Sequence, residues 1–304
     1  MKKCFKSNLM YKNDDSLSII ITENEANSKY KNTLKGLFQP IFLIGDSVFG
    51  NIRLSLPKIG MFPFKNGTVK LVMKYLGSNE VLTETIITTR KVEIPTSPQK
   101  EFIIPFAFDS PNILFPSYFG HTFKLSYFVE ISLKKKILFY DTIKTQEIVF
   151  LNPKDLTKDF VNPKVDLNIN YTPILFDLRL DKRVYGTTDT IKGKLIFPDK
   201  LQYDDIVNIE LKIFCKEVLI DAIKGKISEK EIFKYQLVDG CPRAGSKIPF
   251  YISLEQLQLW VIQFSKSNLI TSKYFIKIYI KLKKDKIAHE VKEYELIMYH
   301  KRIS

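Results

Sequence analysis

Short apolar runs separated by turn-forming residues extend along the whole chain. Each run is rich in Ile, Val, Phe, Tyr and Thr and is bounded by Gly, Pro, Asn or Asp, which is typical of β-strands. In the first half the runs are residues 18–22, 41–56 with a turn at 45–46, 69–75, 81–94, 102–108, 122–133 and 142–151. In the second half they are residues 165–169, 174–180, 190–197, 208–214, 233–238, 248–253, 273–282 and 290–299. The pattern predicts an all-β protein with about seven or eight strands in each half, as in β-sandwiches.

Helical periodicity is weak throughout the chain. The segment 253–264 places apolar residues at helical spacing, among them Leu254, Leu257 and Val261, but a strand followed by a loop accounts for it equally well. We therefore expect almost no helix.

Three landmarks of the first half recur in the second half in the same order. Ile104-Pro105-Phe106 returns as Ile248-Pro249-Phe250, the Tyr-Phe strand at 127–131 returns at 274–278, and the Asp-led segment 46–52 returns at 189–195. The offsets are 144, 147 and 143 residues, so we infer two tandem copies of one domain. Gly50 and Gly193, each four residues after the leading Asp, are predicted to mark a bulge or a close approach of two backbones.

The length of 304 residues suits two domains of about 150 residues. Residues 152–163 carry several charges and two Asn-Pro steps, which disfavour helix and start turns. We expect a first domain at 17–151, a linker at 152–163 and a second domain at 164–302. A hydrophobic content of 45% is enough for two packed cores.

The net charge of +14 has two interpretations. A polyanion such as nucleic acid or anionic lipid is one possible partner. The lysines are scattered, however, and the two densest groups, 134–136 and 281–286, follow predicted strands, where solvated turns are expected. The sequence favours solvation of turns, with weak attraction to a membrane surface as the next interpretation.

The cysteines and the apolar runs bear on location. Cys4, Cys215 and Cys241 form no disulfide framework, which favours a reducing compartment. Residues 1–16 lack the apolar run of a signal peptide, and no stretch reaches the length of a membrane span. We expect a soluble cytosolic protein that could still lie on a membrane.

Candidate chemistry is sparse along the sequence. His121, His289 and His300 lie far apart, and none has a Cys or carboxylate at ligand spacing, so no metal site is expected. Cys215 lies in a predicted strand as a core residue, and Cys241 lies in a turn without a nearby His. Motifs for nucleotides, nucleophilic serines or stacked bases are missing, so neither an enzyme, a cofactor nor a nucleic-acid partner is expected.

The segment 235–249, with its core Asp239-Gly240-Cys241-Pro242, resembles the vacuolar protein sorting-associated protein 26 family, the arrestin-fold subunit of retromer. Further matches lie at 45–50, 117–128, 185–195 and 299–301, so the resemblance covers about residues 18–302. Departures are Cys241, Arg243-Ala244 and Lys247, together with an unlike N-terminal lead and no polar C-terminal tail. The chain is identified as a divergent member. The equivalent subunit of the retriever recycling complex shares the fold and remains the alternative.

The resemblance implies two tandem arrestin-like (immunoglobulin-like) β-sandwiches that act as a scaffold without catalysis. In this family the second sandwich docks onto an α-solenoid, vacuolar protein sorting-associated protein 35, through the loop after the strand 233–238. The matching residues are Leu237, Val238, Asp239, Gly240 and Pro242. The first two would be exposed apolar anchors. By strand alternation, at least one of these two anchors would instead belong to the core.

The resemblance also implies binding of a sorting nexin and of the cytosolic tails of cargo receptors on a peripheral, endosome-bound coat. The matching strand carries Val165, Leu167 and Ile169, and its edge could accept a peptide by β-augmentation. The same alternation fits an ordinary half-buried strand equally well.

Overall fold

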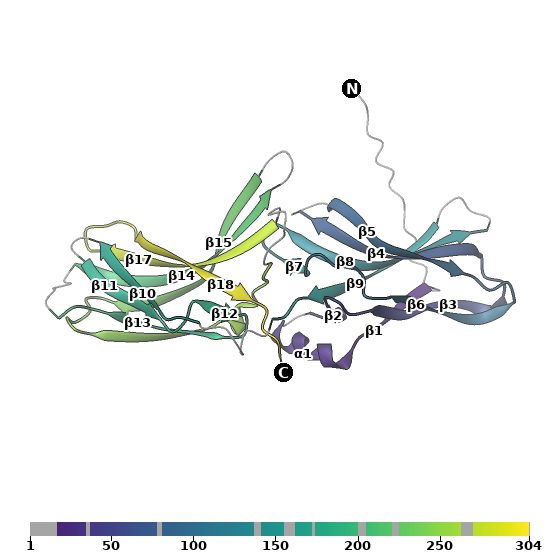
Figure 1. The fold of residues 1–304 in the computed structure, drawn as a ribbon. Helices are drawn as coiled ribbons and strands as arrows, with labels where there is room; N and C mark the ends of the chain where they lie inside the picture. The colour runs from purple at the N-terminus through teal and green to yellow at the C-terminus, as the bar shows by residue number, and fades with distance from the viewer. Residues whose placement is uncertain are drawn as a thin grey trace, which may run out of the picture. The chain divides into compact units, whose positions relative to one another are not determined.

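The structure is a computed structural model that describes residues 17–34, 37–77, 81–136, 141–154, 162–171, 174–199, 205–220, 225–262 and 270–303. The chain divides into two compact units (Figure 1). The first contains Leu37–Ser117 and Phe123–Leu151 together with the chain up to Lys31, and the second contains Asn152–Ser304. Two short segments, Asn32–Gly36 and Tyr118–Thr122, belong to the second unit although they precede it in sequence.

Two sheets build the first unit. Three strands follow the order β1-β3-β6, with bounds β1 Leu17–Thr22, β3 Val48–Gly60 and β6 Gln99–Phe108. The other sheet runs β2-β9-β8-β4-β5, with bounds β2 Ile41–Leu43, β4 Phe64–Leu76, β5 Val81–Glu93, β8 Lys124–Lys135 and β9 Asp141–Leu151. Alternate residues face inward, so Ile52, Val69 and Val129 are completely buried.

The second unit has the same construction. One sheet runs β10-β11-β13-β16, with bounds β10 Val165–Tyr171, β11 Ile174–Leu180, β13 Thr190–Ile196 and β16 Lys247–Ser253. The other runs β12-β18-β17-β14-β15, with bounds β12 Val184–Gly186, β14 Ile206–Ile220, β15 Gly225–Asp239, β17 Ile270–Leu282 and β18 His289–Tyr299. The short strand β7, Tyr118–Phe119, is grouped with this unit. The all-β, two-sandwich prediction is confirmed.

A repeated strand order relates the two units. The order β2-β9-β8-β4-β5 in the first unit corresponds to β12-β18-β17-β14-β15 in the second. In both sheets the short first strand pairs in parallel, β2 with β9 and β12 with β18, whereas the later pairs are antiparallel. The repeat inferred from sequence landmarks is therefore a repeat of topology.

The expectation of almost no helix is confirmed, although the sequence pattern did not predict the one α-helix of the described residues, α1 (Glu25–Thr33). Its inward residues are Tyr30 and the polar Asn27, which are 4% and 3% exposed, so no apolar stripe marks it in the sequence. The amide Nδ2 of Asn27 donates to the carbonyl of Ile41 (3.2 Å) and to Oδ2 of Asp46 (2.9 Å). Asn24 caps the helix, because its Oδ1 accepts the backbone N–H of Ala26 at 3.0 Å. The segment 253–264 instead gives a short 3-10 helix, Glu255–Leu257, and a loop.

In each unit, an aspartate carboxylate accepts a hydrogen bond from the backbone of the short parallel strand. The N–H of Leu43 donates to Oδ2 of Asp46 at 2.8 Å, and the N–H of Gly186 donates to Oδ2 of Asp189 at 3.0 Å. Burial raises the pKa of Asp189, but hydrogen bonds from Lys182, Lys301 and the N–H of Gly186 outweigh it and hold the pKa below its usual value. The Asp of each landmark therefore stabilises the turn that follows the short strand.

The two landmark glycines allow close approach of a neighbouring strand. Gly50 lies opposite Phe106 and Gly193 lies opposite Phe250 in the registers of the two sheets. A Cβ on Gly50 would lie 2.3 Å from the carbonyl oxygen of Ile20. A Cβ on Gly193 would lie 2.3 Å from the ring of Phe250. In each copy, the phenylalanine ring of the Ile-Pro-Phe landmark therefore packs over a glycine. The ring occupies the space that a side chain at the glycine position would take.

Replacement of Gly50 by alanine should lower the free energy of unfolding by roughly 1–3 kcal/mol, because backbone atoms of β1 must shift. Gly60, in the same strand, is the matched control, since its added Cβ meets nothing closer than 3.9 Å. Gly60→Ala should be neutral or slightly stabilising. Urea unfolding of both variants checks the difference, and equal effects would contradict it.

His300 is a buried neutral histidine in the second unit. It is 7% exposed, and its Nε2 accepts the N–H of Val261 at 3.3 Å. Burial lowers its pKa from 6.5 to about 4. Between these two values the unfolded chain binds a proton that the folded chain does not, so His300 contributes stability above pH 6.5 that is lost as the pH falls toward 4.

We expect the free energy of unfolding to fall by about 3 kcal/mol through His300 over that range. In His300→Gln this part of the pH dependence should disappear, whereas it should persist in a His289→Gln control, whose ring is 43% exposed. Urea titrations at several pH values measure both slopes. An unchanged slope in His300→Gln would show that His300 does not stay neutral in the folded state.

Candidate partner-binding sites

The loop after β15 is held in shape by backbone hydrogen bonds. Gly240 follows the strand with φ 75°, a left-handed conformation that favours glycine, and its N–H donates to the carbonyl of Val207 at 2.7 Å. Gly245 has φ 74° and donates to the carbonyl of Pro198 at 3.1 Å. The thiol of Cys241 donates to the carbonyl of Ile206 at 3.4 Å. The loop is therefore held in place by β14 and by the segment that follows β13.

Leu237 and Val238 are both buried, which corrects the expectation that they are exposed anchors. They are 8% and 6% exposed and pack in the core of the second unit. The cause is a β-bulge: Ile209 pairs with Val238, but the next residue, Glu210, pairs with Gln236, so Leu237 is an extra residue. The bulge turns two consecutive side chains inward, where simple alternation would bury only one.

The surface of the loop is small and mixed in character. Asp239, Cys241, Arg243 and Ala244 are exposed. Gly240 and Pro242 are half-buried. The predicted loop-shaping residues Asp239, Gly240 and Pro242 therefore lie together at one end of β15, above a base formed by Leu237 and Val238.

The predicted groove strand is β10, and its apolar side chains face inward. Val165 and Ile169 are 8% and 1% exposed, and Leu167 packs partly buried against the same core. These side chains are therefore not available to a cargo peptide, and the ordinary half-buried strand is the correct interpretation of their alternation. Strand β10 pairs with β11 over its full length and is the last strand of its sheet. Its outer backbone edge, flanked by exposed Asp166 and Asn168, is the part that a peptide could reach.

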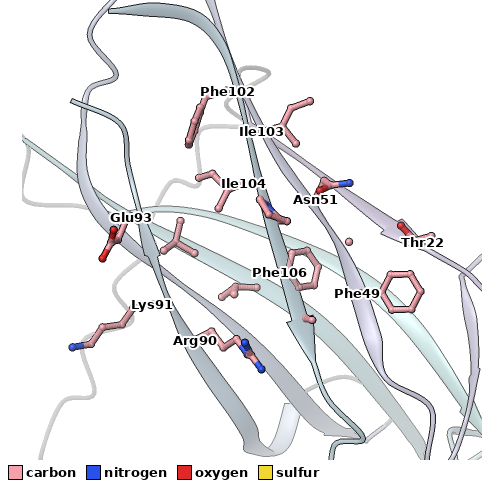
Figure 2. Close-up of a pocket in the computed structure, with 15 residues that line it drawn as sticks. Thr22, Phe49, Asn51, Arg90, Lys91, Glu93, Phe102, Ile103, Ile104 and Phe106 are labelled. Carbon is pink, nitrogen blue, oxygen red and sulfur yellow. The ribbon is translucent and has the colours of Figure 1, made fainter. Parts of the chain in front are cut away.

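A hollow of about 660 Å³ lies beside β5 and β6 of the first unit (Figure 2). Each of these strands ends its sheet, so the hollow is flanked by two strand edges. Phe49 and Ile103 line it and are 43% and 53% exposed. The charged residues among its lining are Arg90, Lys91 and Glu93, so the hollow combines exposed apolar side chains with charges of both signs. Sequence reasoning missed it because its residues come from five strands, β1, β3, β4, β5 and β6.

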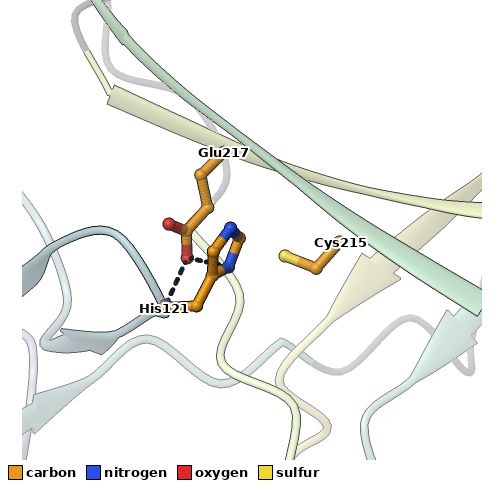
Figure 3. A group of neighbouring side chains, drawn as sticks. All are labelled: His121, Cys215 and Glu217. Carbon is orange, nitrogen blue, oxygen red and sulfur yellow. Dashed lines mark hydrogen bonds and ion pairs between the residues drawn. The ribbon is translucent and has the colours of Figure 1, made fainter. Parts of the chain in front are cut away.

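The fold also brings one histidine to a cysteine and a carboxylate. His121, Cys215 and Glu217 place their ligand atoms within 4.8 Å of one another (Figure 3). Sequence spacing gave no sign of this cluster, because about a hundred residues separate His121 from the other two.

In the part of the chain that the structure describes, no helix is long and apolar enough to cross a membrane.

Comparisons with known proteins agree with the tandem fold. The family model described as "Vacuolar protein sorting-associated protein 26" matches residues 6–286. The chain belongs to this family. Its membership, inferred from the segment 235–249, is therefore confirmed.

Curated relatives of the vacuolar protein sorting-associated protein 26 family are only distantly similar to the chain. It is 22% identical over 244 residues to vacuolar protein sorting-associated protein 26 of Caenorhabditis elegans, covering 78% of this chain and 66% of that protein. Identity to the 26B-B protein of Xenopus laevis is 22% over 272 residues, covering 86% and 78%. The 26B protein of Arabidopsis thaliana is 22% identical over 211 residues, covering 69% and 67%. These values describe a divergent member.

Leu237→Ala should lower the free energy of unfolding by about 2–5 kcal/mol, because it removes a buried side chain and leaves a cavity. Arg243→Ala, six residues away with an exposed side chain, should change it by less than about 0.5 kcal/mol. Thermal and urea unfolding of the two variants test this. A neutral Leu237→Ala would return Leu237 to the role of a surface anchor.

Proposed function

We propose that this chain is the arrestin-fold subunit of a retromer-type coat, a scaffold without catalysis in endosome-to-Golgi retrograde transport. The observation that carries the proposal is the family match over residues 6–286. The repeated topology of two sandwiches supports it, because the match then covers both units and not one sandwich alone.

The partner of the second unit is a solenoid similar to vacuolar protein sorting-associated protein 35, and the contact is the loop that begins at Asp239. Three features support this loop as the contact. Its backbone is fixed before binding by the hydrogen bonds of Gly240 and Gly245, so little conformational freedom is lost on docking. Leu237 and Val238, which precede the loop, pack in the core and so fix the position where the loop begins. The contact surface itself consists of Asp239, Gly240, Pro242 and the exposed residues that follow.

Cargo tails and a sorting nexin would use the free edge of β10. An extended peptide would add as a new strand and pair with the backbone of residues 165–171, which β11 leaves open on one side. Side-chain specificity would come from the outward row of Asp166, Asn168 and Asn170, all exposed. Val165, Leu167 and Ile169 then contribute by keeping the edge rigid.

The net charge of +14 suits a peripheral position on anionic endosomal membrane, where each well-placed Lys contributes about 1 kcal/mol. The same charge is the observation that favours a second candidate, a protein that binds polyanions in general. Salt separates the two, since polyanion binding weakens steeply as salt rises and solenoid docking does not. The equivalent subunit of the retriever complex is the alternative within the same fold.

Affinity purification of the tagged chain from its own cells tests the proposal. A stoichiometric α-solenoid of the retromer type, together with a metallophosphoesterase-fold subunit, would establish it. A retriever solenoid would assign the chain to the sister complex. Nucleic acid alone, or no partner, would show that family membership here reports the fold and not the function.

The double variant Asp239→Arg/Ala244→Asp should abolish capture of the solenoid while the thermal unfolding midpoint stays unchanged, because both side chains are exposed. Glu255→Lys/Gln256→Asp is a matched control, since it places the same kinds of change on exposed residues beyond the other end of β16. The control should bind like the original chain. Equal capture by all three proteins would exclude this loop as the contact.

A further inference from the structure

Strand β14 has a carboxylate at a core position. Alternate residues of the strand face the interior, and Ile209, Leu211 and Ile213 are all completely buried. The next two positions of the same face are Cys215 and Glu217, which are 5% and 1% exposed. On this face the apolar residues are therefore followed by a thiol and a carboxylate, two metal-binding groups on one strand.

The segment Tyr118–Thr122 wraps closely around Glu217. The hydroxyl of Tyr118 and the backbone N–H of His121 donate to Oε1 at 2.7 and 2.9 Å. The N–H of Thr122 donates to Oε2 at 2.8 Å. Gly120 leaves no space for a side chain, since its Cβ would lie 1.9 Å from Oε1. These donors are neutral, and a buried carboxylate is stable only when its charge is compensated.

His121 stands beside Glu217 in an orientation that suits a metal ligand (Figure 3). Its Nδ1 lies 3.2 Å from Oε1 of Glu217, and His121 is the one basic side chain within ion-pair distance of Glu217 in the described ranges. Its other nitrogen, Nε2, lies 3.0 Å from Oγ of Ser228. A histidine that binds a metal through one nitrogen commonly donates its other N–H to such an oxygen, which fixes the ring.

The thiol completes a set of three ligands. The ligand atoms of His121, Cys215 and Glu217 all lie within 4.8 Å of one another. Zn–N, Zn–S and Zn–O bonds at tetrahedral angles would place these atoms about 3.4–3.6 Å apart, so side-chain shifts of about 1 Å close the site. A cysteine binds Zn²⁺ as the thiolate, so the thiol of Cys215 releases its proton to solvent when the cation binds.

A hollow of about 210 Å³ adjoins the three side chains. Lys230, Trp260 and Tyr274 are among the residues that line it, together with the three ligands. A cation held by three protein ligands keeps a fourth position for water, and this hollow has space for that water. The mixture of imidazole, thiolate and carboxylate is typical of Zn²⁺ and not of Mg²⁺ or Ca²⁺, which take oxygen ligands.

We propose that His121, Cys215 and Glu217 bind one Zn²⁺ ion, or a cation of similar softness, with water in the fourth position. The ion compensates the charge of Glu217 and ties the segment Tyr118–Thr122 to β14 through His121. Its role is structural, because it joins two parts of the second unit that are distant in sequence. The site does not depend on which solenoid or cargo the protein binds.

Cobalt absorption tests the site directly. The metal-free full chain, titrated with Co²⁺, should bind one equivalent and show the thiolate-to-cobalt charge-transfer band and the visible bands of a tetrahedral site, and Zn²⁺ should remove both. Cys215→Ser should lose the charge-transfer band. The matched control Cys4→Ser/Cys241→Ser keeps Cys215 as its single cysteine and should retain the full signal.

Measurements of stability and folding distinguish a lost metal site from a variant that fails to fold. Zn²⁺ should raise the thermal unfolding midpoint of the original chain and of the cysteine control. Glu217→Gln, which keeps the shape and removes the charge, should weaken Co²⁺ binding at least about tenfold while circular dichroism shows a folded protein. No charge-transfer band in the original chain, or a band that survives Cys215→Ser, would overturn the proposal and leave Glu217 as a hydrogen-bonded clamp.

Discussion

The alternation of side chains along a strand is the constraint on which this structure depends. Because every second residue of a strand faces inward, each strand needs one row of apolar side chains. The inward rows of two facing sheets together fill each core. Register shifts interrupt the alternation in several strand pairs, and two positions on β15 and β14 bear on the proposed sites. At Leu237 a bulge turns two neighbours inward and sets the base of the proposed solenoid-binding loop. At Glu217 the alternation holds, but the inward residue is charged.

The two units share some structural features, as expected for a duplicated domain, and differ in others. In both units, an aspartate (Asp46 or Asp189) accepts a backbone N–H of the short parallel strand. In both units, a phenylalanine ring also packs over a glycine of the neighbouring strand. The partners of the aspartates have diverged. Asp46 accepts from Asn27 of α1, whereas Asp189 accepts from Lys182 and Lys301. The backbone geometry has thus been retained while the surrounding side chains have specialised.

The sequence predicted the strands and the repeat because these depend on local patterns. Nearly every expected run lies within an observed strand, whereas β12, with three residues, is too short to form a pattern. Helix α1 was missed because its inward face includes an asparagine, which no hydrophobic period reveals. The bulge at Leu237 was missed because register depends on the partner strand. The cluster around Glu217 was missed because its contacts join residues 95 to 99 positions apart.

The wrapping of Glu217 by Tyr118–Thr122 has a consequence for the order of folding. The second unit cannot complete itself from the chain that follows Asn152, because two of its segments, Asn32–Gly36 and Tyr118–Thr122, are synthesised earlier, with the strands of the first unit. A fragment cut at the linker would leave a carboxylate in the interior without its donors. Contacts of such high sequence separation close late and slowly, so the second sandwich should mature only after the first has been made.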